Sequence, residues 1–245
     1  VSRSMAARSS PKALSNLDLA KDLMRRLVNQ LPDARFLIFG YAGLAFPLST
    51  FSDERDYLND VIEHGVYVDV IPKPGSDLTN ALQSLNAAKN SNARYADVSQ
   101  VVLLTDGNMG ELLEESAMVA VDSLRRAGVA LITVGIGSVE GQHVPEIDTR
   151  GRFSGGHETL VDGRLFVTYL QERTLETLAN KSGGAYFSVS ESDRIIAHVR
   201  RTQPALGEVD LTEPTLVGFR DVSWMLLLPL SGALGLLIWR RHDLY

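Results

Sequence analysis

The sequence predicts an α/β fold in which a doubly wound, mostly parallel sheet is flanked by helices, with an inserted β-hairpin and a C-terminal transmembrane helix. Short, mainly apolar segments such as residues 101–105 and 129–136 alternate with amphipathic segments of helical period. Strands that are apolar on both faces are typical of parallel sheets covered by helices on each side. A last apolar segment without any charge, residues 222–239, has the length that a bilayer requires.

Composition narrows the class of protein. The chain has 245 residues, of which 44% are apolar and 22% charged, and this excludes a mainly disordered, collagen-like or multi-span membrane protein. The formal net charge is −6 and Lys and Arg form no basic cluster, so we expect no binding to nucleic acid. The absence of cysteine excludes disulfides, thiolate metal sites and cysteine nucleophiles, but it leaves the compartment open.

The first half of the chain predicts three helices and one strand. Apolar residues spaced by three and four predict a helix over residues 17–31, which ends at a Pro-Asp pair. An apolar run predicts a buried strand over residues 36–41, and residues 53–62 predict a second helix. A Pro-rich turn leads to a third helix over residues 76–89, which begins with the N-capping residues Ser and Asp.

The second half continues the alternation and then interrupts it. We expect a strand at residues 101–105, a helix over residues 112–127 that ends at Gly128, and a strand at residues 129–136. Residues 151–169 are Gly-rich, then alternate in polarity around an Asp-Gly turn, and so predict the inserted hairpin. The domain is then completed by a helix at residues 172–180, a strand at 185–189 and a helix at 193–201.

Residues 222–239 predict a transmembrane helix. These 18 residues span roughly 27 Å as a helix, close to the bilayer core of about 30 Å. Trp224 and Trp239 stand where interfacial aromatics belong, and Arg240 and Arg241 follow, which predicts a cytoplasmic C-terminus. The alternative is a buried core helix. The expected organisation is a domain at residues 1–202, a linker at 203–221, the transmembrane helix at 222–239 and a cytoplasmic tail at 240–245.

Three loops at one edge of the predicted sheet carry hydroxyl or carboxylate oxygens. In open parallel sheets, ligands bind at the carboxyl ends of the strands, and oxygen donors suit Mg²⁺ or Mn²⁺. Each signal alone has a plain structural alternative: chance, a helix N-cap, or a turn after a strand. Together they predict a metal site at this edge. The residues are Ser2 and Ser4 in the first loop, Ser76 and Asp77 in the second, and Thr105 and Asp106 in the third.

These loops resemble the metal-ion-dependent adhesion site of the von Willebrand factor A (vWA) domain family. Residues 1–5, Val-Ser-Arg-Ser-Met, match the tail of the family's Asp-x-Ser-x-Ser motif, and residues 103–107 match its strand-ending Asp motif. Residues 74–82 stand where the family has a Gly-Thr loop, with Ser76 in place of the Thr. The resemblance covers residues 1–202 and implies a vWA fold with Ser2, Ser4, Ser76 and Asp106 as ligands of Mg²⁺ or Mn²⁺.

The resemblance also implies residues upstream of Val1. In the family's motif an Asp stands immediately before the segment that begins here, at the end of the first central strand. We therefore expect this Asp and this strand to precede Val1. Without them, we expect the chain to bind metal poorly and to leave a gap in its sheet.

Within the family, the chain is similar to the bacterial membrane-anchored branch, the Bat-type proteins and accessory proteins of methanol-dehydrogenase gene clusters. The shared features are the Ser-Arg-Ser-Met segment, the inserted hairpin, the sequence Gly-Gly-Ala-Tyr-Phe at residues 183–187 and the C-terminal membrane helix. The resemblance implies further membrane helices upstream, and assembly or maturation of a periplasmic enzyme or envelope complex. With the cytoplasmic C-terminus predicted from Arg240 and Arg241, we expect the vWA domain to face the periplasm from the inner membrane. The implied partners are MoxR-type AAA+ ATPases and sister vWA proteins.

The sequence thus predicts a metal-dependent protein-binding module in which a partner's Asp or Glu carboxylate completes the coordination of the metal. The alternative is a structural membrane-complex subunit whose metal site is unused or degenerate. We do not expect an enzyme, because the chain has no Walker A motif and no general base or nucleophile placed with Asp106; a metal-dependent hydrolase is the third option. His143, His157 and Glu158 lack the spacing of a structural zinc site.

Overall fold

The computed structural model describes residues 1–10, 13–71, 73, 75–91, 95–108, 111–147, 153–160 and 162–203. The chain divides into two compact units, Val1–Gln203 and Pro204–Tyr245, and only the first is described. The predicted linker, transmembrane helix and tail lie outside the described residues. Within the described part, no helix is both long and apolar enough to cross a membrane.

The centre of the domain is a three-stranded parallel sheet. Its strands are β3 (Gln100–Thr105), β4 (Ala130–Gly135) and β9 (Tyr186–Ser188), in the order β3-β4-β9. In its register, Leu103 faces Thr133 across β3 and β4, and Val134 faces Phe187 across β4 and β9. All three strands were predicted, because each is a short, mainly apolar segment.

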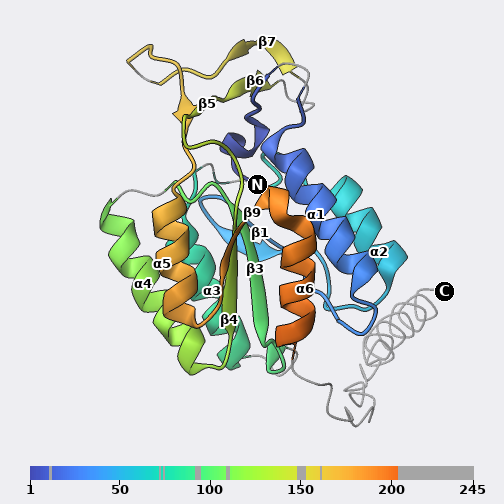
Figure 1. Ribbon diagram of the computed structural model, residues 1–245. Coiled ribbons are helices and arrows are strands. Elements are labelled where there is room, and N and C mark those ends of the chain that lie inside the picture. Colours follow the sequence, from blue (N-terminus) through green and yellow to red (C-terminus); the bar gives the residue numbers. More distant parts are fainter. Residues whose placement is uncertain are drawn as a thin grey trace, which may run out of the picture. The chain divides into compact units, whose positions relative to one another are not determined.

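Helices cover both faces of this sheet (Figure 1). One face packs against α1 (Asn16–Gln30) and α6 (Ser192–Thr202), and the other packs against α3 (Leu78–Ser91), α4 (Glu111–Arg126) and α5 (Glu172–Ser182). Alternation along β4 divides the core, since neighbouring side chains of a strand point to opposite faces. Ile132 and Val134 join the α1–α6 cluster, and Leu131 joins the α3–α4–α5 cluster. This arrangement confirms the predicted α/β fold with a parallel sheet flanked by helices.

The predicted caps at the start of α3 and the end of α4 are observed, and the structure also shows caps at the end of α5 and the start of α1. Asp77 accepts a hydrogen bond from the Asn80 backbone N–H at 2.8 Å and so begins α3. Gly128 and Gly183 adopt positive φ angles of 75° and 80° after α4 and α5, a conformation that glycine tolerates at helix C-termini. At α1, Ser15 and Asp18 form a capping box.

A small antiparallel hairpin lies beside the main sheet. It consists of β1 (Phe39–Tyr41) and β2 (Ala45–Pro47), and it is followed by α2 (Arg55–Asp60), which continues as a π-helical turn, η2 (Val61–Gly65). The sequence predicted β1 and α2 but not β2, because a three-residue strand that ends in Pro has too few residues to show a period of two.

The main sheet and this hairpin do not join. Within the described residues, β3 pairs only with β4 and β1 pairs only with β2. Their ends are linked instead by side chains, since the Tyr41 hydroxyl donates a hydrogen bond to Thr105 Oγ1 at 2.5 Å. One edge of β3 is therefore an open strand edge inside the domain.

The insertion between β4 and α5 forms the part of the domain drawn at the top of Figure 1. It contains β5 (Gln142–His143), β6 (Pro145–Ile147), β7 (Phe153–His157) and β8 (Val167–Thr168), paired β5-β8 and β6-β7. The predicted turn is confirmed, because Thr159 pairs with Leu165 across the Asp-Gly segment. The predicted limits, residues 151–169, were too narrow, because β5 and β6 also belong to the insertion. These two strands are too short to show a period of two, and β5 pairs with β8, which lies far along the chain.

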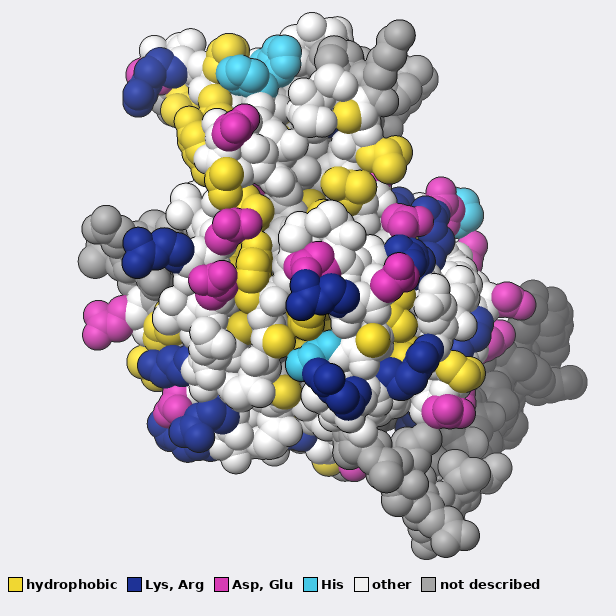
Figure 2. Space-filling model, viewed as in Figure 1, with side chains coloured by type: hydrophobic (Ala, Val, Ile, Leu, Met, Phe, Trp, Pro, Cys, Tyr) yellow, Lys and Arg dark blue, Asp and Glu magenta, His cyan; other side chains and the backbone are white. Residues whose placement is uncertain are grey.

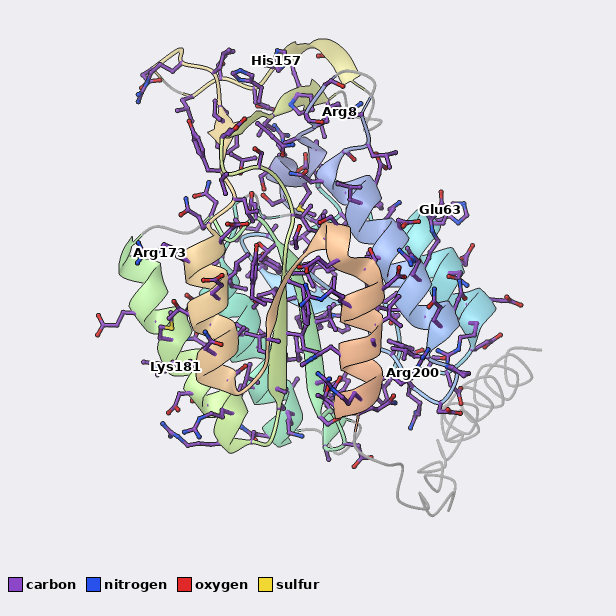
Figure 3. The ribbon with its side chains drawn as sticks, viewed as in Figure 1. Arg8, Glu63, His157, Arg173, Lys181 and Arg200 are labelled. Carbon is purple, nitrogen blue, oxygen red and sulfur yellow. The ribbon has the colours of Figure 1, made fainter. Side chains whose placement is uncertain are left out.

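Figure 3 shows His157 on the insertion at one end of the domain, and Lys181 and Arg200, near the ends of α5 and α6, at the other. The carboxyl ends of β3 and β4 face the insertion. The fold therefore places the insertion over the edge of the sheet where the sequence predicts the metal site.

Candidate metal site

The four residues predicted as metal ligands line one pocket. Its volume is about 260 Å³, and Ser2, Ser4, Ser76 and Asp106 all belong to its wall. They come from the N-terminal segment, the loop before α3 and the end of β3. The fold brings these three segments together at the carboxyl edge of the sheet, as the sequence predicted.

Ser2 and Ser4 belong to a tight turn. Ser2 stands at the N-cap of the 3₁₀ helix η1 (Arg3–Ala6), and the Ser4 side chain is buried. The Ser4 hydroxyl donates a hydrogen bond to Ser2 Oγ at 3.3 Å, so both oxygens lie on the same side of the turn.

Asp106 is a buried carboxylate at the end of β3, with only 2% of its surface exposed. Its Oδ2 accepts a hydrogen bond from Thr168 Oγ1 at 2.6 Å, and its Oδ1 accepts one from the Asn108 backbone N–H at 3.2 Å. Both donors are neutral, so they orient the carboxylate without cancelling its charge. Burial of a charge that is not balanced by a cation is costly, and such a carboxylate favours a metal ion.

In the second loop, the helix N-cap and the candidate metal ligand are two different residues. Asp77 caps α3, while Ser76, one residue earlier, lines the pocket. Between this loop and β3 lies Tyr41, whose phenol is hydrogen-bonded to Thr105. Burial, together with the charge of Asp106, raises the pKa of Tyr41, so the phenol stays protonated and remains a donor.

Two further side chains, Thr168 and Arg3, were not predicted from the sequence as part of the site. Thr168, on β8 of the insertion, holds Asp106. Arg3 lines the pocket and pairs with Asp69 and Glu158, each at 2.9 Å. Phe166 lines the pocket, and Thr168, two residues later, contacts Asp106, so both follow the period of two that predicted the hairpin. The sequence pattern could therefore have indicated Thr168. The partners of Arg3 are far from it in the sequence, so no local pattern indicates these ion pairs.

Asp69 has a special backbone conformation. Its φ of +61° makes it the one non-glycine residue with positive φ in the described part of the chain. Its backbone N–H donates to the Val1 carbonyl and its side chain accepts from Arg3, so contacts with the N-terminal segment hold this strained residue.

The donor set fits a hard divalent cation. Three hydroxyls and one carboxylate supply oxygen ligands only, and Mg²⁺ prefers oxygen and keeps several water ligands. Across the described residues, no group of three or more His, Cys, Asp and Glu is placed to hold a metal. Ser2, Ser4, Ser76 and Asp106 can thus hold Mg²⁺ or Mn²⁺, with water or an added carboxylate in the other positions.

Among the solved structures that share this fold are two from Bacteroides species. An aerotolerance-related membrane protein from Bacteroides fragilis superposes with a TM-score of 0.69 at 22% identity, over 82% of this chain and 92% of that one. The conserved hypothetical protein BatB from Bacteroides thetaiotaomicron gives a TM-score of 0.69 at 23% identity, over 82% of this chain and 94% of that one. At such low identity the likeness concerns the fold. No curated protein sequence matches the chain.

The family itself is shown by the sequence. The profile of the von Willebrand factor type A domain matches residues 2–161, which is more than half of the chain and includes all four predicted ligand residues. On this match, the protein belongs to the von Willebrand factor type A domain family.

Proposed function

We propose that this protein is a membrane-anchored vWA module that binds a protein partner through a Mg²⁺-dependent adhesion site. The metal would be held by Ser2, Ser4, Ser76 and Asp106, with Mn²⁺ as a substitute. The observation that carries the proposal is that these four side chains, from three segments far apart in the sequence, line one pocket with oxygen donors only.

Each residue has a defined task in this proposal. A bound Mg²⁺ supplies a positive centre with an open position for an Asp or Glu carboxylate of the partner. Asp106 balances part of that charge, and Thr168 together with the Asn108 N–H fixes its orientation. The protonated Tyr41 holds the end of β3 through Thr105. These contacts orient the ligands before a partner arrives.

Binding rather than catalysis is the proposed activity. The described wall of the pocket contains no His or Cys, and its carboxylates Asp69 and Glu158, which could otherwise act as general bases, are paired with Arg3. Serine hydroxyls are another type of nucleophile in the pocket wall, but in our proposal Ser2, Ser4 and Ser76 serve as metal ligands.

We further propose membership in the Bat-type branch, with the domain facing the periplasm from the inner membrane. The fold likeness to BatB and to the aerotolerance-related membrane protein supports this, as does the apolar segment at residues 222–239 that precedes Arg240 and Arg241. The corresponding work is assembly or maturation of a periplasmic enzyme or envelope complex, with a MoxR-type ATPase and sister vWA proteins as partners.

The experiment is chelator sensitivity of partner binding. Complexes of the full-length protein would be cross-linked in membranes in Mg²⁺ and in EDTA, for the wild type, Asp106→Ala and the control Asp97→Ala, whose side chain is exposed. We expect the same partners with wild type and D97A in Mg²⁺, and their loss in EDTA or in D106A. Complexes that persist in EDTA and in D106A would instead support a structural subunit with an unused metal site.

A further inference from the structure

The insertion contributes side chains to the pocket as well as covering it. Glu158 and Phe166 belong to the pocket wall, and Thr168 touches Asp106. In Figure 1 the insertion stands at the end of the sheet where β3 and β4 end. The sequence between β4 and α5 therefore adds a carboxylate, Glu158, to a site whose proposed ligands all come from other segments.

Arg3 connects this carboxylate to the N-terminal segment. Its Nη1 lies 2.9 Å from Glu158 Oε1, and its Nε lies 2.9 Å from Asp69 Oδ2. Arg3 stands between Ser2 and Ser4 in the sequence, so the same short turn carries two proposed metal ligands and the cation that binds Glu158. The ion pair joins residues 155 positions apart in the chain.

The charges in the pocket wall are unbalanced. Three carboxylates, of Asp69, Asp106 and Glu158, and one guanidinium, of Arg3, leave two negative charges among the side chains of the wall. Arg3 pairs with Asp69 and Glu158, while Asp106 has neutral hydrogen-bond donors. A divalent cation balances this remainder, and opposite charges attract more strongly in a part-buried pocket than in water.

We propose that Glu158 of the insertion belongs to the metal pocket, and that Arg3 competes with the metal for it. Without metal, Arg3 neutralises Glu158 and holds the insertion against the N-terminal turn. With metal, Glu158 faces a second cation, either directly or through the water ligands that Mg²⁺ retains. The metal and the insertion are thereby coupled. This inference rests on the proposed function, because it takes the pocket to be a metal site.

We expect substitutions of Glu158 and of Arg3 to change the affinity for the metal in opposite directions. Glu158→Gln removes a negative charge from the pocket and is expected to raise the Kd for Mg²⁺ about tenfold. Arg3→Gln removes the competing positive charge and is expected to lower the Kd by a similar factor. A residue that only supported the fold would weaken metal binding in either variant, so the opposite signs distinguish the proposal from a structural role.

The test is calorimetric titration of Mg²⁺, and of Mn²⁺ followed by its paramagnetic resonance signal, into the full-length protein in detergent. Glu140→Gln and Arg164→Gln are matched controls, because both side chains are exposed on the insertion outside the pocket wall. Glu158→Asp keeps the charge and is expected to retain most of the affinity. Amide hydrogen exchange without metal gives a second readout: E158Q and R3Q should both speed exchange in the insertion relative to the controls.

The outcomes separate this inference from the proposed function. If D106A abolishes metal binding while E158Q and R3Q titrate like the wild type, the metal site stands and the role of Glu158 and Arg3 is refuted. If the wild type binds neither metal, or if D106A binds as the wild type does, the proposed function and this inference both fail. A lower Kd in R3Q together with a higher Kd in E158Q supports the proposal.

Discussion

At the scale of single residues, the site depends on how one carboxylate is held. Asp106 follows β3 directly, and its two oxygens are bound by Thr168 and by the Asn108 N–H. A hydrogen bond to a charged acceptor contributes about 1.5–3 kcal/mol, and a buried acceptor that loses its donor carries a further desolvation cost. Thr168 is fully buried, so water cannot replace its hydroxyl without rearrangement.

We therefore expect Thr168→Val, which keeps the shape but removes the donor, to lower the free energy of unfolding by about 2 kcal/mol. Denaturant unfolding in chelator measures this loss. Thr159→Val, at an exposed position of the same insertion, should change stability by less than about 0.5 kcal/mol. Equal denaturant midpoints for Thr168→Val and Thr159→Val would show that the hydrogen bond between Thr168 and Asp106 does not stabilise the site.

His198 gives a prediction about pH. Its ring packs on Phe187 with the centroids 5.3 Å apart, and burial, with the nearby charge of Arg201, lowers the pKa of His198. The unfolded chain then binds the proton more readily than the folded one, so stability falls as the pH drops below the ordinary value of about 6.5. Thermal unfolding between pH 7.5 and 5 should show a smaller loss for His198→Gln than for the wild type. An equal or larger loss of stability in His198→Gln would show that the pKa of His198 is not lowered in the folded protein.

At the scale of elements, periodicity predicted most of the domain. The helices α1, α3, α4, α5 and α6 and the strands of the main sheet were predicted because each pattern is local. The strands β2, β5 and β6 were missed because their two or three residues are too few to show a period of two, and the partner of β5 lies far along the chain. In the same way, Ser2, Ser4, Ser76 and Asp106 follow from short motifs, whereas Arg3 meets Glu158 only through the fold.

The connection from α5 to β9 has a strict packing requirement. A Cβ atom on Gly184 would lie 2.0 Å from the backbone oxygen of Leu131 on β4, a contact that side-chain motion cannot relieve. Gly184→Ala should therefore lower the free energy of unfolding by about 3 kcal/mol or prevent folding. Gly65→Ala is the control, since its added Cβ would meet only a Val61 side chain at 3.2 Å. Circular dichroism during urea unfolding checks both, and a G184A protein as stable as G65A would disprove this packing.

At the scale of the whole molecule, the separation of β1 from β3 is the main irregularity. Parallel α/β sheets are normally continuous, and an open edge with apolar faces favours association with other chains. Among the described residues, nothing pairs with the outer edge of β3. The vWA resemblance predicts an upstream strand for this place, with the motif's Asp at its end.

We expect residues 1–203 alone to aggregate. The same segment, extended by about ten natural residues upstream of Val1, should remain monomeric, because an added strand would pair with the open edges of β1 and β3. Light scattering coupled to gel filtration distinguishes the two. A monomeric, cooperatively folding short form would mean that the edge of β3 needs no further strand.

The central claim is that the pocket formed by Ser2, Ser4, Ser76 and Asp106 binds Mg²⁺, and thermal unfolding tests it most directly. The protein, extended upstream to include the expected Asp, would be melted in Mg²⁺ and in EDTA, beside its Asp106→Ala variant. A ligand that binds only the folded state at 100 times its Kd adds about 2.7 kcal/mol to the free energy of unfolding. We predict a Tm several degrees higher in Mg²⁺ for the protein with Asp106, and no difference for D106A. Equal Tm values in Mg²⁺ and EDTA for the protein with Asp106 would contradict the assignment of the site.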